Sequence, residues 1–131
     1  MLKTGKKGRD IKFFSRKNDA MVMVHSSDSY RYAVLLEERD DIGRYEAGRA
    51  LDSQKMKLLN RIGIRKEYLD ASWETDFYIE NTDGSVSVRE ITTEKALSTR
   101  AEAEKLELSR RFWTDLCGVH DWKVVIMRGG R

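Results

Sequence analysis

A glycine turn between two alternating runs is the feature that most restricts how this chain can fold. The stretch WETDFYIENTDGSVSVREIT, residues 73–92, alternates apolar and polar residues on both sides of Thr82-Asp83-Gly84. Alternation with a period of two predicts two strands. A three-residue loop with Gly84 at positive φ would join them as a type I turn plus bulge, and it places Asp76 opposite Glu90. A two-residue loop, 83–84, would instead put the two acids on opposite faces.

The acid pair suggests a metal site. Like charges facing each other across a hairpin destabilise it unless they share a proton or a cation. Mg²⁺, or Mn²⁺, binds a few carboxylates and completes its shell with water and phosphate oxygens. In this interpretation Asp76 and Glu90 hold the ion, and a lysine two residues after Glu90 would stabilise charge developing on a phosphate. In the alternative, Asp76 lies at a solvated sheet end and Glu90 pairs with an arginine such as Arg89 or Arg100.

Helical and extended patterns alternate along the rest of the chain. An apolar run at 20–26 is consistent with a strand or the approach to a helix, and an apolar run at 121–128 indicates a strand of the type that is buried on both faces. Further periodic segments predict helices at 27–39, 54–63 and 99–117 and a strand at 43–51. This order predicts an α/β fold with a mixed sheet flanked by helices on both sides.

Charge is concentrated at the N-terminus. Residues 1–17 contain seven lysines and arginines and one acid, a net charge of +6 in a chain whose total is +3. We therefore expect residues 1–18 to form a flexible basic arm on a single domain, 19–131, although a solubilising tail would have the same composition. An arm of this kind binds nucleic acid by displacing counterions. The residues expected to contact nucleic acid are Lys6, Lys7, Arg9, Lys12, Arg16 and Lys17.

The composition favours an intracellular globular protein. No run approaches the roughly 20 apolar residues that a membrane span requires, and no apolar signal-peptide core follows the basic start. The single cysteine, Cys117, excludes an intramolecular disulfide and fits a reducing compartment such as the cytoplasm. We expect Cys117 to be a packing residue at the end of a helix.

Three segments resemble the N-terminal nuclease domain of the TnsA transposon endonucleases, which belong to the restriction-endonuclease-like PD-(D/E)xK superfamily. YAVLLEERDDIGRYE is similar to the family's first helix and following strand, and WETDFYI resembles its T-D-F strand. EKALSTRAEAEKLELSRRFW, with the later DWKVVI, is similar to its lysine-rich turn, long helix and final strand. The resemblance covers about three quarters of the chain. It implies a restriction-endonuclease-like mixed sheet and hydrolysis of DNA phosphodiester bonds.

The resemblance also implies roles for individual residues. Asp76 matches the family's metal-binding aspartate, and Glu90 matches the acid of its E-x-K element. The lysine of that element falls on Thr92, so Lys95 or Lys105 would have to supply the positive charge. The helix-one glutamate of the family falls on Ser29, with Asp28 one residue away as a substitute metal ligand.

Two main hypotheses follow. The first is a Mg²⁺- or Mn²⁺-dependent DNA endonuclease that acts on DNA, with a transposase or another protein as a further partner. The second is a catalytically impaired member that keeps the fold as a DNA-binding or protein-binding module, motivated by Thr92 and Ser29. Protein assembly alone is a third option. The sequence leaves open whether the chain assembles with itself.

Overall fold

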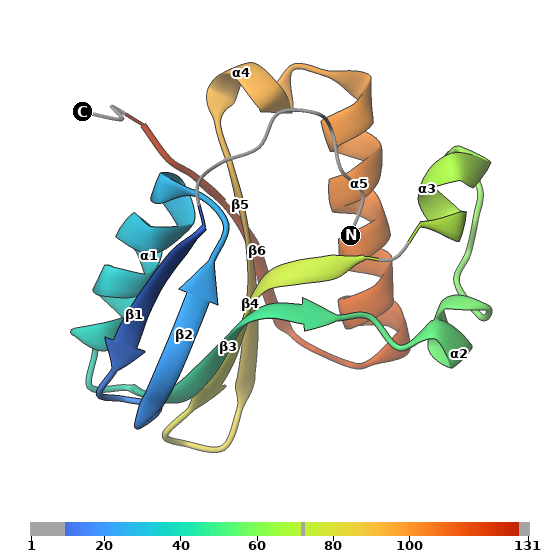
Figure 1. The fold of residues 1–131 in the computed structure, drawn as a ribbon. Helices are drawn as coiled ribbons and strands as arrows, with labels where there is room; N and C mark the ends of the chain where they lie inside the picture. Colours follow the sequence, from blue (N-terminus) through green and yellow to red (C-terminus); the bar gives the residue numbers. More distant parts are fainter. Residues whose placement is uncertain (1–9, 72, 129–131) are drawn as a thin grey trace.

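A four-stranded mixed sheet organises the molecule. The computed structural model describes residues 10–71 and 73–128. The sheet consists of β3 (Ile42–Ala50), β4 (Glu74–Asn81), β5 (Val86–Thr92) and β6 (Asp121–Ile126), in the order β3-β4-β5-β6. β4 pairs antiparallel with both β3 and β5, and β6 pairs with β5 in parallel. The α/β fold with a mixed sheet is therefore confirmed (Figure 1).

The β4–β5 hairpin has the three-residue register. Tyr78 pairs with Val88 and Phe77 with Arg89. The N–H of Asn81 donates to the carbonyl of Ser85 at 2.9 Å, and Gly84 has a φ of 91°. The two-residue loop is thus excluded, and the same register sets Asp76 opposite Glu90.

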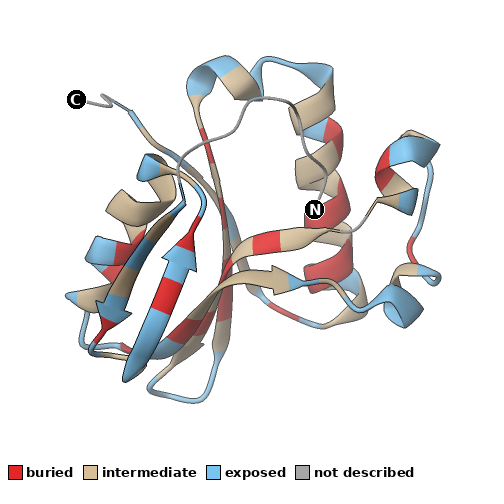
Figure 2. Cartoon of the chain, in the orientation of Figure 1, coloured by how far each residue is buried: buried red, intermediate tan, exposed pale blue. Residues whose placement is uncertain are grey.

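Two hydrophobic clusters lie on the two faces of the sheet. On one face pack helix α1 (Ser27–Glu37) and a separate hairpin of β1 (Ile11–Ser15) and β2 (Ala20–Val24), which cover Tyr45, Phe77 and Ile79. On the other face pack α5 (Arg100–Arg110) and the π-helix η1 (Arg111–Leu116), which cover Val88. Figure 1 shows α1 and α5 on opposite sides of the sheet, and Figure 2 shows buried positions along the sheet and α5.

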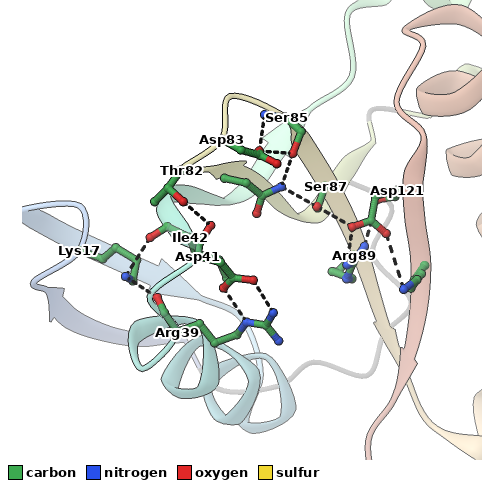
Figure 3. A network of polar contacts seen from close by, with 12 residues as sticks. Lys17, Arg39, Asp41, Ile42, Thr82, Asp83, Ser85, Ser87, Arg89 and Asp121 are labelled. Atoms are coloured by element: carbon green, nitrogen blue, oxygen red, sulfur yellow. Dashed lines mark hydrogen bonds and ion pairs between the residues drawn. The ribbon is translucent and has the colours of Figure 1, made fainter.

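The expected flexible arm is too long. Residues 11–15 form β1, which pairs antiparallel with β2, because Ile11 and Phe13 pack against the α1 cluster. Lys17 is fixed rather than mobile: its ammonium donates to the carbonyls of Arg39 at 2.8 Å and Ile42 at 2.9 Å (Figure 3). Lys12 and Arg16 are exposed. Lys6, Lys7 and Arg9 lie outside the described residues.

The helix expected at 54–63 is also wrong. Only Ser53–Met56 is helical (α2), and the next turn closes with the tighter bonds Leu58 N–H to Lys55 and Leu59 N–H to Met56. The Asn60 side chain then accepts the Ile62 N–H at 3.0 Å, which competes with a helix. Two short helices, α3 (Lys66–Asp70) and α4 (Glu94–Leu97), complete the structure.

The last helix and strand differ in detail from the expected pattern. The 99–117 helix begins with the Thr99 side-chain cap, runs as α5 and then widens into η1, where the Cys117 N–H bonds the Phe112 carbonyl five residues back. β6 is an edge strand and is partly exposed, so it is not buried on both faces. No helix in the described ranges has the length and apolar character needed to cross a membrane.

Candidate functional site

The two hairpin acids interrupt the backbone ladder between their strands. Regular β4–β5 pairing ends at Phe77 and Arg89. One step further, the Asp76 N–H donates to Glu90 Oε1 at 3.1 Å, and the Ile91 N–H donates to Asp76 Oδ2 at 2.7 Å. Each carboxylate therefore accepts a backbone N–H that a neighbouring carbonyl would otherwise bond. Both acids therefore lie at the point where β4 and β5 separate.

Glu90 is held by three elements. Its side chain is 6% exposed, and its Oε2 accepts hydrogen bonds from the Thr75 hydroxyl on β4 and, at 2.5 Å, from the Ser109 hydroxyl on α5. The Ser109 oxygen in turn accepts the Trp122 indole N–H from β6 at 2.9 Å. The orientation of Glu90 is thus fixed by its surroundings, and the structural alternative, a pair with Arg89 or Arg100, is not observed: Arg89 bonds Asp121 and Arg100 bonds Glu104.

The paired acids have a strong affinity for protons. Burial, and next the negative charge of Glu90, raise the pKa of Asp76 well above its ordinary value. Burial also raises the pKa of Glu90, although the hydrogen bonds from Ser109, Thr75 and the Asp76 N–H act in the opposite direction. Each acid therefore holds its proton more tightly than a carboxyl group in water does.

A cavity of about 210 Å³ opens beside the pair on the α5 side, and it contains a lysine. Asp76, Glu90 and Lys105 all line it. The Lys105 ammonium lies 3.7 Å from Glu102 Oε1 and 5.8 Å from the centre of the Trp73 ring. The structure therefore places Lys105 on the same cavity as the two acids.

Glu102 is a site residue that the sequence interpretation missed. Its Oε2 accepts a 2.7 Å hydrogen bond from the Thr92 hydroxyl, and its other oxygen faces Lys105. It lines the same cavity, and its charge contributes to the raised pKa of Asp76. The sequence could have indicated Glu102 by its spacing from Lys105. The two residues are three apart on a helix, so they share a face.

Lys95 and Asp28 lie elsewhere. Lys95 is exposed on α4 and lines neither of the two cavities around Asp76. Asp28, in the first turn of α1, binds Arg31 at 2.9 Å and is likewise outside both cavities. Its neighbour Ser29 does line the second of these cavities, about 140 Å³, together with Asp76. Of the candidates, the structure groups Asp76, Glu90 and Lys105.

The donor set is compatible with a hard cation but is small. Within residues 10–71 and 73–128, no group of three or more His, Cys, Asp or Glu side chains is placed to hold a metal ion. Two adjacent carboxylates with raised pKa values still fit Mg²⁺, which prefers oxygen ligands and keeps several waters. A divalent cation would supply the positive charge that allows both acids to ionise.

Comparison with known proteins does not assign a family. The sequence matches no protein-family profile, and no similar chain is found among curated proteins.

Proposed function

We propose that this protein is a metal-dependent DNA endonuclease whose reaction centre is the pair Asp76 and Glu90. The main support is the pair itself: two acids with raised pKa values interrupt a β-ladder at the wall of an open cavity that also contains Lys105. Two like charges opposite each other destabilise a sheet. Destabilising pairs with shifted pKa values are found most often at functional sites. The resemblance to the TnsA nuclease domain agrees with this assignment.

In this proposal Asp76 and Glu90 hold Mg²⁺ or Mn²⁺. The bound ion would polarise a DNA phosphate and lower the pKa of a water molecule. Thr75 and Ser109 keep the Glu90 carboxylate oriented toward the cavity through their hydroxyl groups. Preorganised ligands of this kind avoid reorganisation when the substrate binds.

Lys105 supplies the positive charge in place of the lysine that the family pattern has at Thr92. Its ammonium is only 3.7 Å from Glu102, which keeps it beside the acids. There it would stabilise the negative charge that develops on the phosphate oxygens during hydrolysis. The exposed Lys12 and Arg16 would contact the DNA backbone without reading sequence.

The experiment is nicking of supercoiled plasmid with Mg²⁺ and then Mn²⁺. We expect Asp76→Asn and Glu90→Gln to abolish nicking and Lys105→Met to reduce its rate by about 100-fold, the usual effect of losing one charge-stabilising donor. Lys95→Met, the same change on exposed α4, is the matched control and should stay within about twofold of wild type. Nicking that persists in Asp76→Asn would refute the proposed site.

One observation favours a second function, that of a catalytically impaired binding module. At the position of the family's lysine, the Thr92 hydroxyl is already bonded to Glu102, and Thr92 is only 5% exposed. A protein that shifts DNA on a gel but nicks it with neither metal would support this function. If it binds no DNA at physiological salt either, a protein partner becomes the better proposal.

A further inference from the structure

A further cavity, larger than the two around Asp76, is separate from the acid pair. It has a volume of about 560 Å³, within the range of small-molecule sites, and shares no lining residue with the two cavities around Asp76. It lies where the end of β3, α2, the turn after η1 and the start of β6 come together (Figure 1).

Aromatic rings form one wall of this cavity. The ring centres of Tyr78 and Trp113 lie 5.3 Å apart, and those of Trp113 and Phe112 lie 5.0 Å apart. The Arg49 guanidinium lies over Tyr78, with its central carbon 4.0 Å from the ring centre. Phe112 and Trp113 both belong to the π-helix η1, a rare helix type that is frequent at functional sites. A flat aromatic ligand could extend this stack beside Arg49.

Two cationic side chains, Arg49 and Lys55, line the cavity together with His120. Arg49 also pairs with Glu46 at 3.3 Å. The Lys55 ammonium contacts Cys117 Sγ at 3.8 Å, and in the described part of the chain no carboxylate lies within ion-pair distance of it. The lining also includes two acids, but both are engaged elsewhere. Asp52 accepts the backbone N–H groups that cap α2, and Asp121 binds Arg89 at 2.9 Å.

One buried polar group beside the cavity lacks a partner. Trp113 is 5% exposed and lines the cavity, yet its indole N–H is the single buried side-chain nitrogen or oxygen, among the described residues, that has no hydrogen-bond partner. An unpaired buried donor is costly, and a native structure generally retains one for a reason. The nitrogen itself has almost no accessible surface, so a ligand would reach it only after a shift of the cavity wall.

We propose that this cavity binds a nucleotide, either as a free nucleoside phosphate or as one residue of a nucleic-acid strand. The base lies against Arg49 and the aromatic wall. The phosphate lies at the rim between Lys55 and Arg49. This site is independent of the acid pair, and it stands whether or not the protein cleaves DNA.

Cys117 provides a direct reporter of occupancy. It is the single cysteine of the chain and lines this cavity, so a chromogenic disulfide reagent labels one position. The full chain is labelled with and without deoxynucleoside monophosphates, short single-stranded oligonucleotides, nucleosides and inorganic phosphate. We expect nucleotides to slow Cys117 labelling at least fivefold, with a matching change in tryptophan fluorescence. Nucleosides and phosphate alone should have little effect.

Single substitutions then test the contacts. Arg49→Ala and Lys55→Ala should each raise the half-protecting concentration by about tenfold, as expected for loss of a hydrogen bond to a charged group. Arg44→Ala, on the same strand but outside the cavity, is the matched control and should change nothing. In Asp76→Asn, nucleotides should protect Cys117 as well as they do in wild type. That result would separate this site from the proposed nuclease site.

The outcomes are decisive in both directions. Protection by oligonucleotides at far lower concentrations than by mononucleotides would identify a strand as the source, and the reverse would identify a free nucleotide. No protection by either up to about 10 mM, where a ligand with a Kd of about 1 mM would nearly saturate the site, would overturn the proposal. Equal protection by inorganic phosphate would also overturn it, because no base would then be recognised.

Discussion

Thr92 on β5 and Glu102 on α5 are joined by a 2.7 Å hydrogen bond, and the other oxygen of Glu102 faces the Lys105 ammonium. At residue 92, where the family pattern has a lysine, the chain has the hydroxyl of Thr92. The Glu102 carboxylate that binds this hydroxyl also holds Lys105 on α5. A lysine at residue 92 and the lysine at residue 105 would therefore both place an ammonium group beside Glu102.

This arrangement predicts a rescue. In a Lys105→Met background, Thr92→Lys should restore plasmid nicking by about tenfold, because a lysine at 92 reaches the same carboxylate and the same cavity. Thr92→Met in that background is the matched control and should restore nothing. Circular dichroism would verify that all three variants fold. A folded but unrescued double variant would show that the two positions are not equivalent.

The acid pair predicts an unusual pH dependence of stability. An acid whose pKa is raised by folding binds more protons in the folded state, so its contribution to stability is lost as the pH rises from about 4 through the raised folded pKa. Without divalent cations, Asp76→Asn should therefore be more stable than wild type at pH 8, by on the order of 1 kcal/mol, with the difference vanishing near pH 4. Urea unfolding across this pH range measures it.

The turn acid offers a control for that series. Hydrogen bonds from Ser85 lower the pKa of Asp83, so Asp83→Asn should not gain stability at high pH. Magnesium added to wild type should recover part of the missing stability, whereas Asp76→Asn should not respond. An Asp76→Asn variant that is less stable than wild type at pH 8 would contradict the assignment of a destabilised pair.

Glu37 predicts the opposite pH dependence. Burial alone would raise the pKa of Glu37, but hydrogen bonds from Ser15, Tyr45 and the Lys17 N–H lower it. The stability it contributes is present above the unfolded pKa and is lost as the pH falls through the lowered folded pKa. Glu37→Gln should cost about 1–2 kcal/mol at pH 7 and less near pH 3, measured by urea unfolding. Glu38→Gln, its exposed neighbour, should cost little at either pH; equal losses would contradict this role.

The N-terminal basic residues predict the salt dependence of DNA binding. Replacing Lys3, Lys6, Lys7 and Arg9 with glutamine should weaken DNA binding and flatten the slope of log affinity against log salt concentration. The slope should fall by up to about 0.9 for each phosphate that is no longer neutralised. Fluorescence anisotropy with a labelled duplex measures the slope. An unchanged slope would mean that these residues only solubilise the chain.

The hairpin acids could be predicted because their placement depends on local chemistry. Gly84 fixes the loop, the loop fixes the register, and the register sets Asp76 opposite Glu90. β1 escaped prediction because lysines and arginines surround its two inward hydrophobic residues, Ile11 and Phe13, and obscure their alternation.

The remaining site residues depend on tertiary packing. Whether Lys95 or Lys105 reaches the acids is decided by how α5 lies against β5, which no local pattern encodes. The same holds for Ser109, whose contact with Glu90 joins residues 19 apart in the chain.

The π-helix has a consequence for insertions and deletions. A π-turn closes a hydrogen bond over five residues where an α-turn closes it over four, so it accommodates one extra residue and the residues after it keep nearly the same orientation. Deleting one residue within Arg111–Leu116 would let the segment close as ordinary α-helix with little change in its length. The backbone would survive such a deletion and Cys117 would keep its place beside Lys55, so the extra residue of this one turn changes only which side chains the turn itself presents to the cavity that Cys117 lines.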